Sequence, residues 1–357
     1  MLCFENYTFM EVDYIIVGLG IAGICFSKQL LEHNKRFLVI SDKCSGATEK
    51  SGGVFNPIVL RRFTAPEYTI KYTEYALNMF AAMEKMTSTS WMYPDQNVYR
   101  IFASIEEQNN WFTASDKPHL KPFLAPKIEL NSNNFIQAEF GLGKVLKSFR
   151  IDTIAFLQSF QRYFLKTQKL MEESFNHSNL SFQNGDYPIR YKHVKAKAIL
   201  FAEGTRILQN PFLPKAVIRP NKGEYLIIKA PDLKLDYMLK GGVYIIPLGE
   251  DLYKVGATYS HDDNTIQPTQ AARKEIEEKL QKMITCHYDV VDQIVGARPV
   301  TNDRQPILGE IKTGMYVFNG LGTRGFTRGP YYSKVLFDAI ENKQSVPKQM
   351  DVKRFLS

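Results

Sequence analysis

The chain has 357 residues, of which 44% are apolar and 23% charged, and its formal net charge is +8. These values exclude a disordered or low-complexity protein, and the length predicts two domains. No segment reaches the roughly 18 consecutive apolar residues that cross a bilayer, so we predict no membrane span and a cytoplasmic location. The basic charge permits attraction to nucleic acid or an anionic substrate, but the lysines are spread along the chain, which favours an ordinary solvated surface.

The cysteines and histidines give no sign of a metal or disulfide site. No two cysteines stand in C-x-x-C spacing, and no two histidines lie four residues apart as ligands on one helix face would. We therefore predict no metal. The scattered cysteines are Cys3, Cys25, Cys44 and Cys286.

A buried strand, a glycine turn and a helix follow one another near the start of the chain. Residues 14–17 are apolar and rich in β-branched side chains, as in a parallel sheet buried on both faces. Gly18, Gly20 and Gly23 then fall in G-x-G-x-x-G spacing, and residues 24–31 carry an apolar stripe at helical spacing. Such a turn lets backbone N–H groups and a helix N-terminus approach a pyrophosphate, which predicts a dinucleotide site.

A second buried strand at residues 37–40 ends in an acidic residue. Asp42 lies about twenty residues beyond the glycines, where a carboxylate accepts hydrogen bonds from the ribose of a dinucleotide. Two alternatives stay open: Asp42 is a solvated turn residue, or Ser41 holds the strand-end position.

The next elements follow in chain order. We interpret residues 1–9, ahead of Met10, either as residues upstream of the true start or as a loose leader, in both cases outside the fold. The composition then predicts a ligand-binding loop at 43–57. Three helices are predicted: one at 66–86 whose tyrosine-rich face packs in the core, a long amphipathic one at 151–171, and a charged one at 271–285. A strand at 194–202 is predicted to return to the first sheet, and antiparallel strands are predicted at 222–228, 242–247 and 252–259.

A second glycine turn lies near the end of the chain. A strand at 314–318 precedes Gly320, Gly322 and Gly325, which repeat the G-x-G-x-x-G spacing, and a helix runs through residue 340. Too little chain follows for another strand with an acidic end. We therefore interpret this turn as backbone aimed at the ligand of the first motif.

Four separated motifs share one order. They are Gly18 to Gly23, the Ser51-Gly-Gly53 loop, Tyr244-Ile-Ile-Pro247, and Gly296-Ala-Arg-Pro299 with Gly320 to Gly325. Their order resembles the D-amino acid oxidase family of FAD-dependent oxidoreductases, which includes glycine oxidase and sarcosine oxidase. The resemblance implies an α/β fold: a Rossmann-like FAD-binding domain built from residues 10–60, 144–215 and 295–357, with an inserted α+β substrate domain of residues 61–143 and 216–294 that contains an antiparallel sheet.

The resemblance also implies the cofactor site. The pyrophosphate of FAD would lie at Gly18, Gly20 and Gly23, and its ribose at Asp42. The flavin ring would lie near Ser51, Gly52 and Gly53, with a further cofactor contact at Gly204. The N1/O2 edge of the ring would face Gly322, Arg324, Gly325 and Phe326. Glu203 stands where relatives usually have a small residue, which leaves the contact around Gly204 open. We expect a non-covalent flavin, because no cysteine lies between residues 287 and 357.

Two residues match substrate-binding positions of the family. Arg298 matches the arginine that pairs with a substrate carboxylate in the amino acid oxidases, and Tyr244 matches the tyrosine that supports it. A guanidinium can hold a carboxylate through two charge-assisted hydrogen bonds. A structural ion pair for Arg298 and strand packing for Tyr244 are the alternatives. The implied reaction is hydride transfer from the carbon next to nitrogen onto flavin N5, which depends mainly on positioning.

Three functions stay open at this stage. The first is an FAD-dependent oxidoreductase that oxidises the C–N bond of a small carboxylated amine or amino acid. The second is a tRNA-modifying flavoenzyme acting on an N-substituted glycine group of a wobble uridine. Residues 320–327 resemble the oxidoreductase half of the bifunctional enzyme that removes a carboxymethyl group from an aminomethyl-thiouridine of tRNA, and Arg61, Arg62, Arg324 and Arg328 favour an RNA partner. The third is a flavin-binding protein without turnover.

Overall fold

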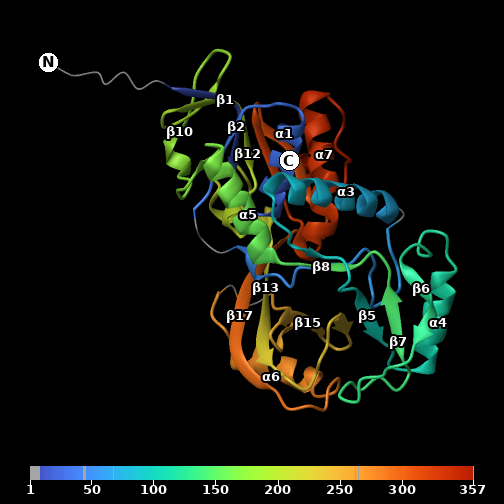
Figure 1. The fold of residues 1–357 in the computed structure, drawn as a ribbon. Helices are drawn as coiled ribbons and strands as arrows, with labels where there is room; N and C mark the ends of the chain where they lie inside the picture. Colours follow the sequence, from blue (N-terminus) through green and yellow to red (C-terminus); the bar gives the residue numbers. More distant parts are fainter. Residues whose placement is uncertain (1–8, 43–45, 67, 262, 264, 357) are drawn as a thin grey trace. The chain divides into compact units, whose positions relative to one another are not determined.

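The structure is a computed structural model that describes residues 9–42, 46–66, 68–261, 263 and 265–356. Most of the predicted leader, part of the predicted loop at 43–57, Cys3 and Cys44 lie outside the described residues. The chain packs into two compact units (Figure 1), one of residues 1–47, 157–220 and 298–357 and the other of residues 48–156 and 221–297.

The boundaries of these units differ from the predicted domain boundaries at several points. Residues 48–60 and 144–156, which we assigned to the FAD-binding domain, belong to the second unit. The reason is a strand pairing that we did not predict from the sequence. The strand β8 (Phe149–Ile151) pairs with both β3 (Val54–Phe55) and β4 (Met92–Tyr93).

A mixed sheet runs through the first unit. Its centre is β1 (Met10–Val17), which pairs in parallel with β2 (Phe37–Ile40) on one side and β12 (Val194–Phe201) on the other. The pairing of β12 with β1 confirms the predicted return of the chain to the first sheet. The C-terminal half of β12 also pairs in parallel with β19 (Met315–Asn319). The sheet is completed by β9 (Leu170–Met171), β10 (Leu180–Phe182), β11 (Ile189–Tyr191) and β18 (Ile307–Lys312).

Two helices of the first unit pack closely because glycine removes the side chains between them. These are α1 (Ile21–Glu32) and α7 (Gly325–Glu341). A Cβ at Gly325 would lie 3.0 Å from Cγ2 of Ile21, and one at Gly329 would lie 3.5 Å from Cγ1 of the same residue. The 3₁₀ turns of this unit are η1 (His177–Asn179), η2 (Gly204–Gln209), η3 (Lys215–Val217), η4 (Gly322–Arg324) and η5 (Val352–Phe355).

The long helix predicted at 151–171 is shorter in the structure. It is α5 (Thr153–Lys166), and the chain after it turns at Gln168, which has a φ of 56°. Leu170 and Met171 then pair with β2 as the short strand β9. The amphipathic pattern therefore ran past the helix end because the residues of a following strand were also apolar.

A large sheet forms the second unit, in the order β17, β13, β16, β15, β14, β5, β7 and β6. The strand β16 (Leu252–Gly256) lies between β13 (Arg219–Lys229) and β15 (Tyr244–Gly249) and is antiparallel to both, as predicted. The others are β5 (Val98–Ile101), β6 (Leu124–Glu129), β7 (Leu142–Val145), β14 (Met238–Lys240) and β17 (Asp289–Val300), and the remaining helices are α2 (Ala47–Lys50), α3 (Thr69–Thr87), α4 (Ile105–Ser115) and α6 (Gln270–Leu280).

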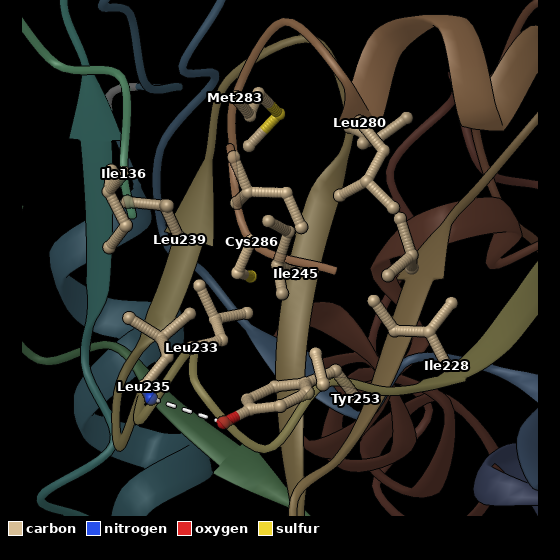
Figure 2. Close-up of a cluster of buried hydrophobic side chains, with 14 of the residues drawn as sticks. Ile136, Ile228, Leu233, Leu235, Leu239, Ile245, Tyr253, Leu280, Met283 and Cys286 are labelled. Carbon is tan, nitrogen blue, oxygen red and sulfur yellow. Dashed lines mark hydrogen bonds between the residues drawn. The ribbon is translucent and has the colours of Figure 1, made fainter. Parts of the chain in front are cut away.

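Apolar clusters cover both faces of this sheet. One face packs Leu239, Ile245 and Tyr253 against Leu280 and Met283 (Figure 2), which lie in and just after α6. In the same cluster the hydroxyl of Tyr253 accepts a hydrogen bond from the N–H of Leu235 at 3.1 Å. The other face packs Met238, Ile246 and Val98 with Trp111 and with residues 58–63, and the partly buried Tyr225 and Tyr244 lie against it.

Two helix predictions in the second unit need correction. The core face of α3 contains Met79 and Phe80, as predicted, together with Thr73, Ala76 and Met83. The tyrosines contribute less than predicted, because Tyr72 and Tyr75 are only partly buried and Tyr68, just before the helix, is 62% exposed. The helix predicted at 271–285 ends at Leu280, because residues 281–284 turn and Ile284 pairs with the isolated strand position Ile136.

Candidate cofactor and substrate sites

At the first glycine turn, the backbones of β1, α1 and the residue after β12 lie very close together. Gly18 has a φ of 106°, and a Cβ there would lie 2.5 Å from the carbonyl oxygen of Ala202. A Cβ at Gly23 would lie 2.1 Å from the carbonyl oxygen of Gly18. Both distances are too short for any real side chain, so the turn and the first helical turn are packed as a dinucleotide-binding motif requires.

The N-terminus of α1 has the electrostatics of an anion site. Gly20 is the N-cap residue with extended backbone, no side chain forms a cap hydrogen bond, and the first turn contains no acidic residue. The partial positive charge of the helix N-terminus is therefore not neutralised by the helix's own side chains. This donor set fits the pyrophosphate of FAD.

Asp42 follows β2, and its carboxylate accepts hydrogen bonds from two side chains of the first unit. Its Oδ2 accepts a hydrogen bond from Nη1 of Arg206 at 2.8 Å and another from the hydroxyl of Ser174. The Ser41 hydroxyl, in contrast, donates to the backbone oxygen of Asp42 at 3.3 Å. We did not predict Arg206 or Ser174 from the sequence, although Arg206 lies only two residues after the predicted cofactor contact Gly204.

The turn after β12 brings Glu203 into a buried polar cluster. Its carboxylate accepts a hydrogen bond from Nδ2 of Asn210 at 2.8 Å and lies 2.9 Å from Nε2 of His177, with only 6% of the side chain exposed. Gly204 has a φ of 58°, and its carbonyl oxygen accepts a hydrogen bond from Nδ2 of Asn319 at 2.9 Å. The bulky Glu203 side chain is thus partnered within the protein at the position where we left the cofactor contact open.

The second glycine turn lies against the start of α1. Gly320 has a φ of 72° and Gly322 a φ of 56°. The helix α7 then begins at Gly325 with no side-chain cap and no acidic residue in its first turn. Because Gly325 contacts Ile21, the first residue of α1, the structure brings the two sequence-predicted glycine turns together within one unit. Arg324 is the N-cap residue of α7, and Phe326 is buried.

The Ser51-Gly52-Gly53 loop belongs to the second unit. A Cβ at Gly53 would lie 1.9 Å from the carbonyl oxygen of Ile151, and Gly53 has a φ of 63°. A Cβ at Gly52 would lie 2.7 Å from Cδ1 of Ile246 and 3.1 Å from the hydroxyl of Tyr225. The loop is therefore packed directly on β8, β13 and β15.

Lys254 holds this loop in place, and the sequence reasoning missed it. Its Nζ donates to the carbonyl oxygen of Ser51 at 2.7 Å and lies 5.0 Å from the ring centroid of Tyr225, and the residue is only 7% exposed. Burial, with the charge of Lys50, lowers the pKa of Lys254 to about 8. The strand pattern could have indicated the position of Lys254. Tyr253 and Val255 face one apolar cluster, so Lys254 between them must face the opposite side of the sheet.

The two candidate substrate residues lie in different units. Tyr244 is partly buried in β15, and its hydroxyl accepts a hydrogen bond from Nδ2 of Asn56 at 3.1 Å. Arg298 is partly exposed near the end of β17. Val300, two residues further along, has its Cγ2 3.6 Å from where a Cβ of Gly322 would lie, and alternate residues of a strand share a face. Arg298 therefore lies on the strand face that meets the second glycine turn.

Metal and membrane features can be stated for the described part of the chain. Within it, no three His, Cys, Asp or Glu side chains gather as metal ligands, and no helix is both long and apolar enough to cross a bilayer. The thiols of Cys25 and Cys286 are free and buried.

Solved structures with this fold include several oxidases and a dehydrogenase. Glycine oxidase from Geobacillus kaustophilus superposes with a TM-score of 0.76 at 16% identity, covering 97% of this chain and 98% of that one. The L-proline dehydrogenase from P. horikoshii gives 0.77 at 14% identity with the same coverage, and iminodiacetate oxidase from Chelativorans sp. BNC1 gives 0.74 at 16% identity, covering 96% and 98%. These likenesses confirm the predicted fold class.

Curated relatives match a part of the chain. The tRNA 5-methylaminomethyl-2-thiouridine biosynthesis bifunctional protein of Idiomarina loihiensis is 26% identical over 193 residues, which is 48% of this chain and 31% of that protein. Its namesake from Campylobacter jejuni subsp. doylei is 24% identical over 198 residues, or 51% and 32%. These matches span about a third of the length of the relatives.

The family description "FAD dependent oxidoreductase", abbreviated DAO, matches residues 13–339. This range contains all the predicted cofactor and substrate residues, and it confirms the predicted enzyme class and FAD as the cofactor. The chain belongs to the DAO family of FAD-dependent oxidoreductases.

Proposed function

We propose that the enzyme oxidises the C–N bond of a small carboxylated amine or amino acid. The observation that carries the proposal is the place of Arg298, on the strand face that meets the Gly322 turn. A carboxylate bound by Arg298 would hold the substrate beside the turn to which we assign the flavin edge. The names of several solved structures with this fold, among them glycine oxidase and iminodiacetate oxidase, agree with this substrate class.

The protein's part in the reaction is binding and orientation. The turn at Gly18, Gly20 and Gly23 would hold the pyrophosphate, Asp42 the ribose, and the N–H groups at the start of α7 the N1/O2 edge, without a covalent link. Bound FAD supplies the acceptor for the substrate hydride at its N5 atom.

The substrate side needs two residues in this proposal. The Arg298 guanidinium grips the carboxylate through two parallel hydrogen bonds and so fixes the carbon that loses the hydride. Tyr244, whose hydroxyl accepts a hydrogen bond from Asn56, keeps the carboxylate-supporting role that the family resemblance implies as part of this proposal. A cytoplasmic location remains part of this proposal.

The test is replacement of Arg298. We expect Arg298→Ala to raise the KM for a carboxylated amine about tenfold or more, because the substrate loses a charge-assisted bidentate contact, while FAD content stays unchanged. Arg298→Lys should recover a part of the affinity, and Lys215→Ala, at an exposed lysine of the turn η3, is the control. An unchanged KM in Arg298→Ala would remove the carboxylate role.

A second candidate function has its own support. The curated relatives act in tRNA 5-methylaminomethyl-2-thiouridine biosynthesis, and the chain is basic. In this alternative the same chemistry acts on an N-substituted glycine group of a tRNA wobble uridine. It predicts tRNA binding that weakens steeply with salt, and bleaching of the flavin by hypomodified tRNA but not by small amines.

A further inference from the structure

Four parallel strands of the first unit end at the same edge of its sheet. They are β1, β2, β12 and β19. The last directly paired residues of β12 and β19 are Phe201 and Val317. Beyond this pair each chain segment turns at a glycine with left-handed backbone, Gly204 with a φ of 58° and Gly320 with a φ of 72°. Dinucleotides bind at this carboxyl edge of a parallel sheet.

The side chain of Asn319 joins these two turns. Its Nδ2 donates a hydrogen bond to the carbonyl oxygen of Gly204 at 2.9 Å, and its Oδ1 accepts one from the N–H of Gly320 at 2.8 Å. The residue is only 3% exposed. Both ends of a buried amide are thus bonded to the backbone of two different turns, and the link between β12 and β19 continues after their direct pairing ends.

The same two turns also contact the first glycine turn and the helix that follows it. A Cβ at Gly18 would lie 2.5 Å from the carbonyl oxygen of Ala202, the residue after β12. A Cβ at Gly325 would lie 3.0 Å from Cγ2 of Ile21, the first residue of α1. Asn319 therefore closes a ring of contacts around the three turns, and all of them belong to one compact unit.

Further side chains anchor the turn after β12. The carboxylate of Glu203 accepts a hydrogen bond from Nδ2 of Asn210 at 2.8 Å and lies 2.9 Å from Nε2 of His177. Only 6% of the Glu203 side chain is exposed. The residue next to Gly204 is thus held by two other segments, so Asn319 attaches the second glycine turn to backbone that is itself fixed.

We propose that Asn319 is a positioning residue for FAD, which fixes the distance between the turn that holds the pyrophosphate and the turn that holds the N1/O2 edge of the flavin. The two ends of FAD are covalently joined, so one molecule contacts both turns only when their separation matches its length. The inference rests on the cofactor placement within the proposed function and not on the proposed substrate. Asn319 needs no contact with FAD for this role.

The second unit offers a matched control. Nδ2 of Asn133 donates a hydrogen bond to the carbonyl oxygen of Leu233 at 2.7 Å, and its Oδ1 accepts one from the N–H of Phe135 at 2.9 Å. Asn133 thus joins two loops through the same two kinds of bond as Asn319. Its replacement removes a comparable bridge without touching the three turns.

The test titrates the apoprotein with FAD, followed by flavin fluorescence, and with ADP, followed by calorimetry. We expect Asn319→Ala to weaken FAD about tenfold and ADP less than about twofold, because ADP reaches the pyrophosphate and ribose positions alone. Asn319→Asp keeps the acceptor for the N–H of Gly320 but loses the donor for Gly204, so it should weaken FAD by a similar factor. Asn133→Ala should leave both dissociation constants unchanged.

The aspartate variant separates the bridge from a local cap on the second glycine turn. If Asn319→Asp binds FAD as tightly as wild-type protein does, the bond to Gly320 is sufficient and the inference is wrong. Equal weakening of FAD and ADP in either variant would mean a general loss of structure and would also contradict it. If Asn319→Ala does not fold, the comparison of FAD with ADP in the nearly isosteric Asn319→Asp decides.

The wild-type protein supplies one further check. Equal affinity for ADP and FAD would mean that the flavin end adds nothing to binding, and the inference would fall. None of these titrations contains an amine. The proposed substrate is therefore tested separately, by reduction of the bound flavin, and either proposal can fail while the other stands.

Discussion

The glycines of the first turn are fixed by individual contacts. Gly23 is the clearest case, because a Cβ there would lie 2.1 Å from the carbonyl oxygen of Gly18. Gly23→Ala must therefore move α1 away from the turn. We expect a loss of about 1–3 kcal/mol in unfolding free energy and a clear fall in bound FAD per protein.

Gly46 serves as the control for that substitution. A Cβ at Gly46 would meet no described atom within 4 Å, so Gly46→Ala should leave both the unfolding free energy and the FAD content unchanged. Equal FAD content in the two variants would mean that the turn does not bind the cofactor.

Lys254 gives a pH-dependent prediction. Its pKa is lowered from 10.5 to about 8 in the folded protein, so between those values the unfolded chain binds more protons than the folded one. Stability due to this residue should therefore rise with pH across that window, by up to about 3 kcal/mol. Urea unfolding of wild-type protein and Lys254→Met between pH 8 and 10.5 measures it. Identical pH slopes in the two proteins would contradict the burial of a charged Lys254.

At the scale of elements, Arg206 of η2 contacts Asp42, the residue after β2 that we assign to the ribose of FAD. Arg206→Ala removes the 2.8 Å contact that orients the Asp42 carboxylate. We expect the apoprotein to bind FAD several-fold more weakly, an effect kept modest because Arg206 is half exposed. Fluorescence titration with FAD measures it, and Arg206→Lys should restore much of the affinity. Tighter binding by Arg206→Ala would mean that Arg206 competes with the ribose for Asp42.

Single elements were predictable where a local rule decides them. The strand, glycine turn and helix around Gly18 follow from β-branched residues, glycine spacing and an apolar stripe, and the structure has each of them. The end of α5 was not predictable in this way, because the turn at Gln168 interrupts an apolar pattern that continues into β9. Lys254 and Arg206 were missed because their contacts are made to Ser51 and Asp42, which are far away in sequence.

At the scale of the whole molecule, the glycine motifs and the family resemblance predicted the fold class and the cofactor. The boundaries of the two compact units were harder to predict from the sequence. Residues 144–156 look like the start of a new segment, but β8 pairs with β3 and β4 and so joins the second unit. Such long-range pairings carry no local signal in a single sequence.

The central claim is the oxidation of a carboxylated amine, and anaerobic reduction of the bound flavin tests it most directly. Purified holoenzyme is mixed without oxygen with N-methylglycine, iminodiacetate, glycine or hypomodified tRNA, and the flavin absorbance is followed. The account predicts that a small carboxylated amine bleaches the flavin of wild-type enzyme and does so far more weakly in Arg298→Ala. Flavin that dithionite reduces but that none of the small amines reduces would contradict it. In that case, bleaching by the tRNA alone would support the second candidate, and no bleaching at all would support a flavin-binding protein without turnover.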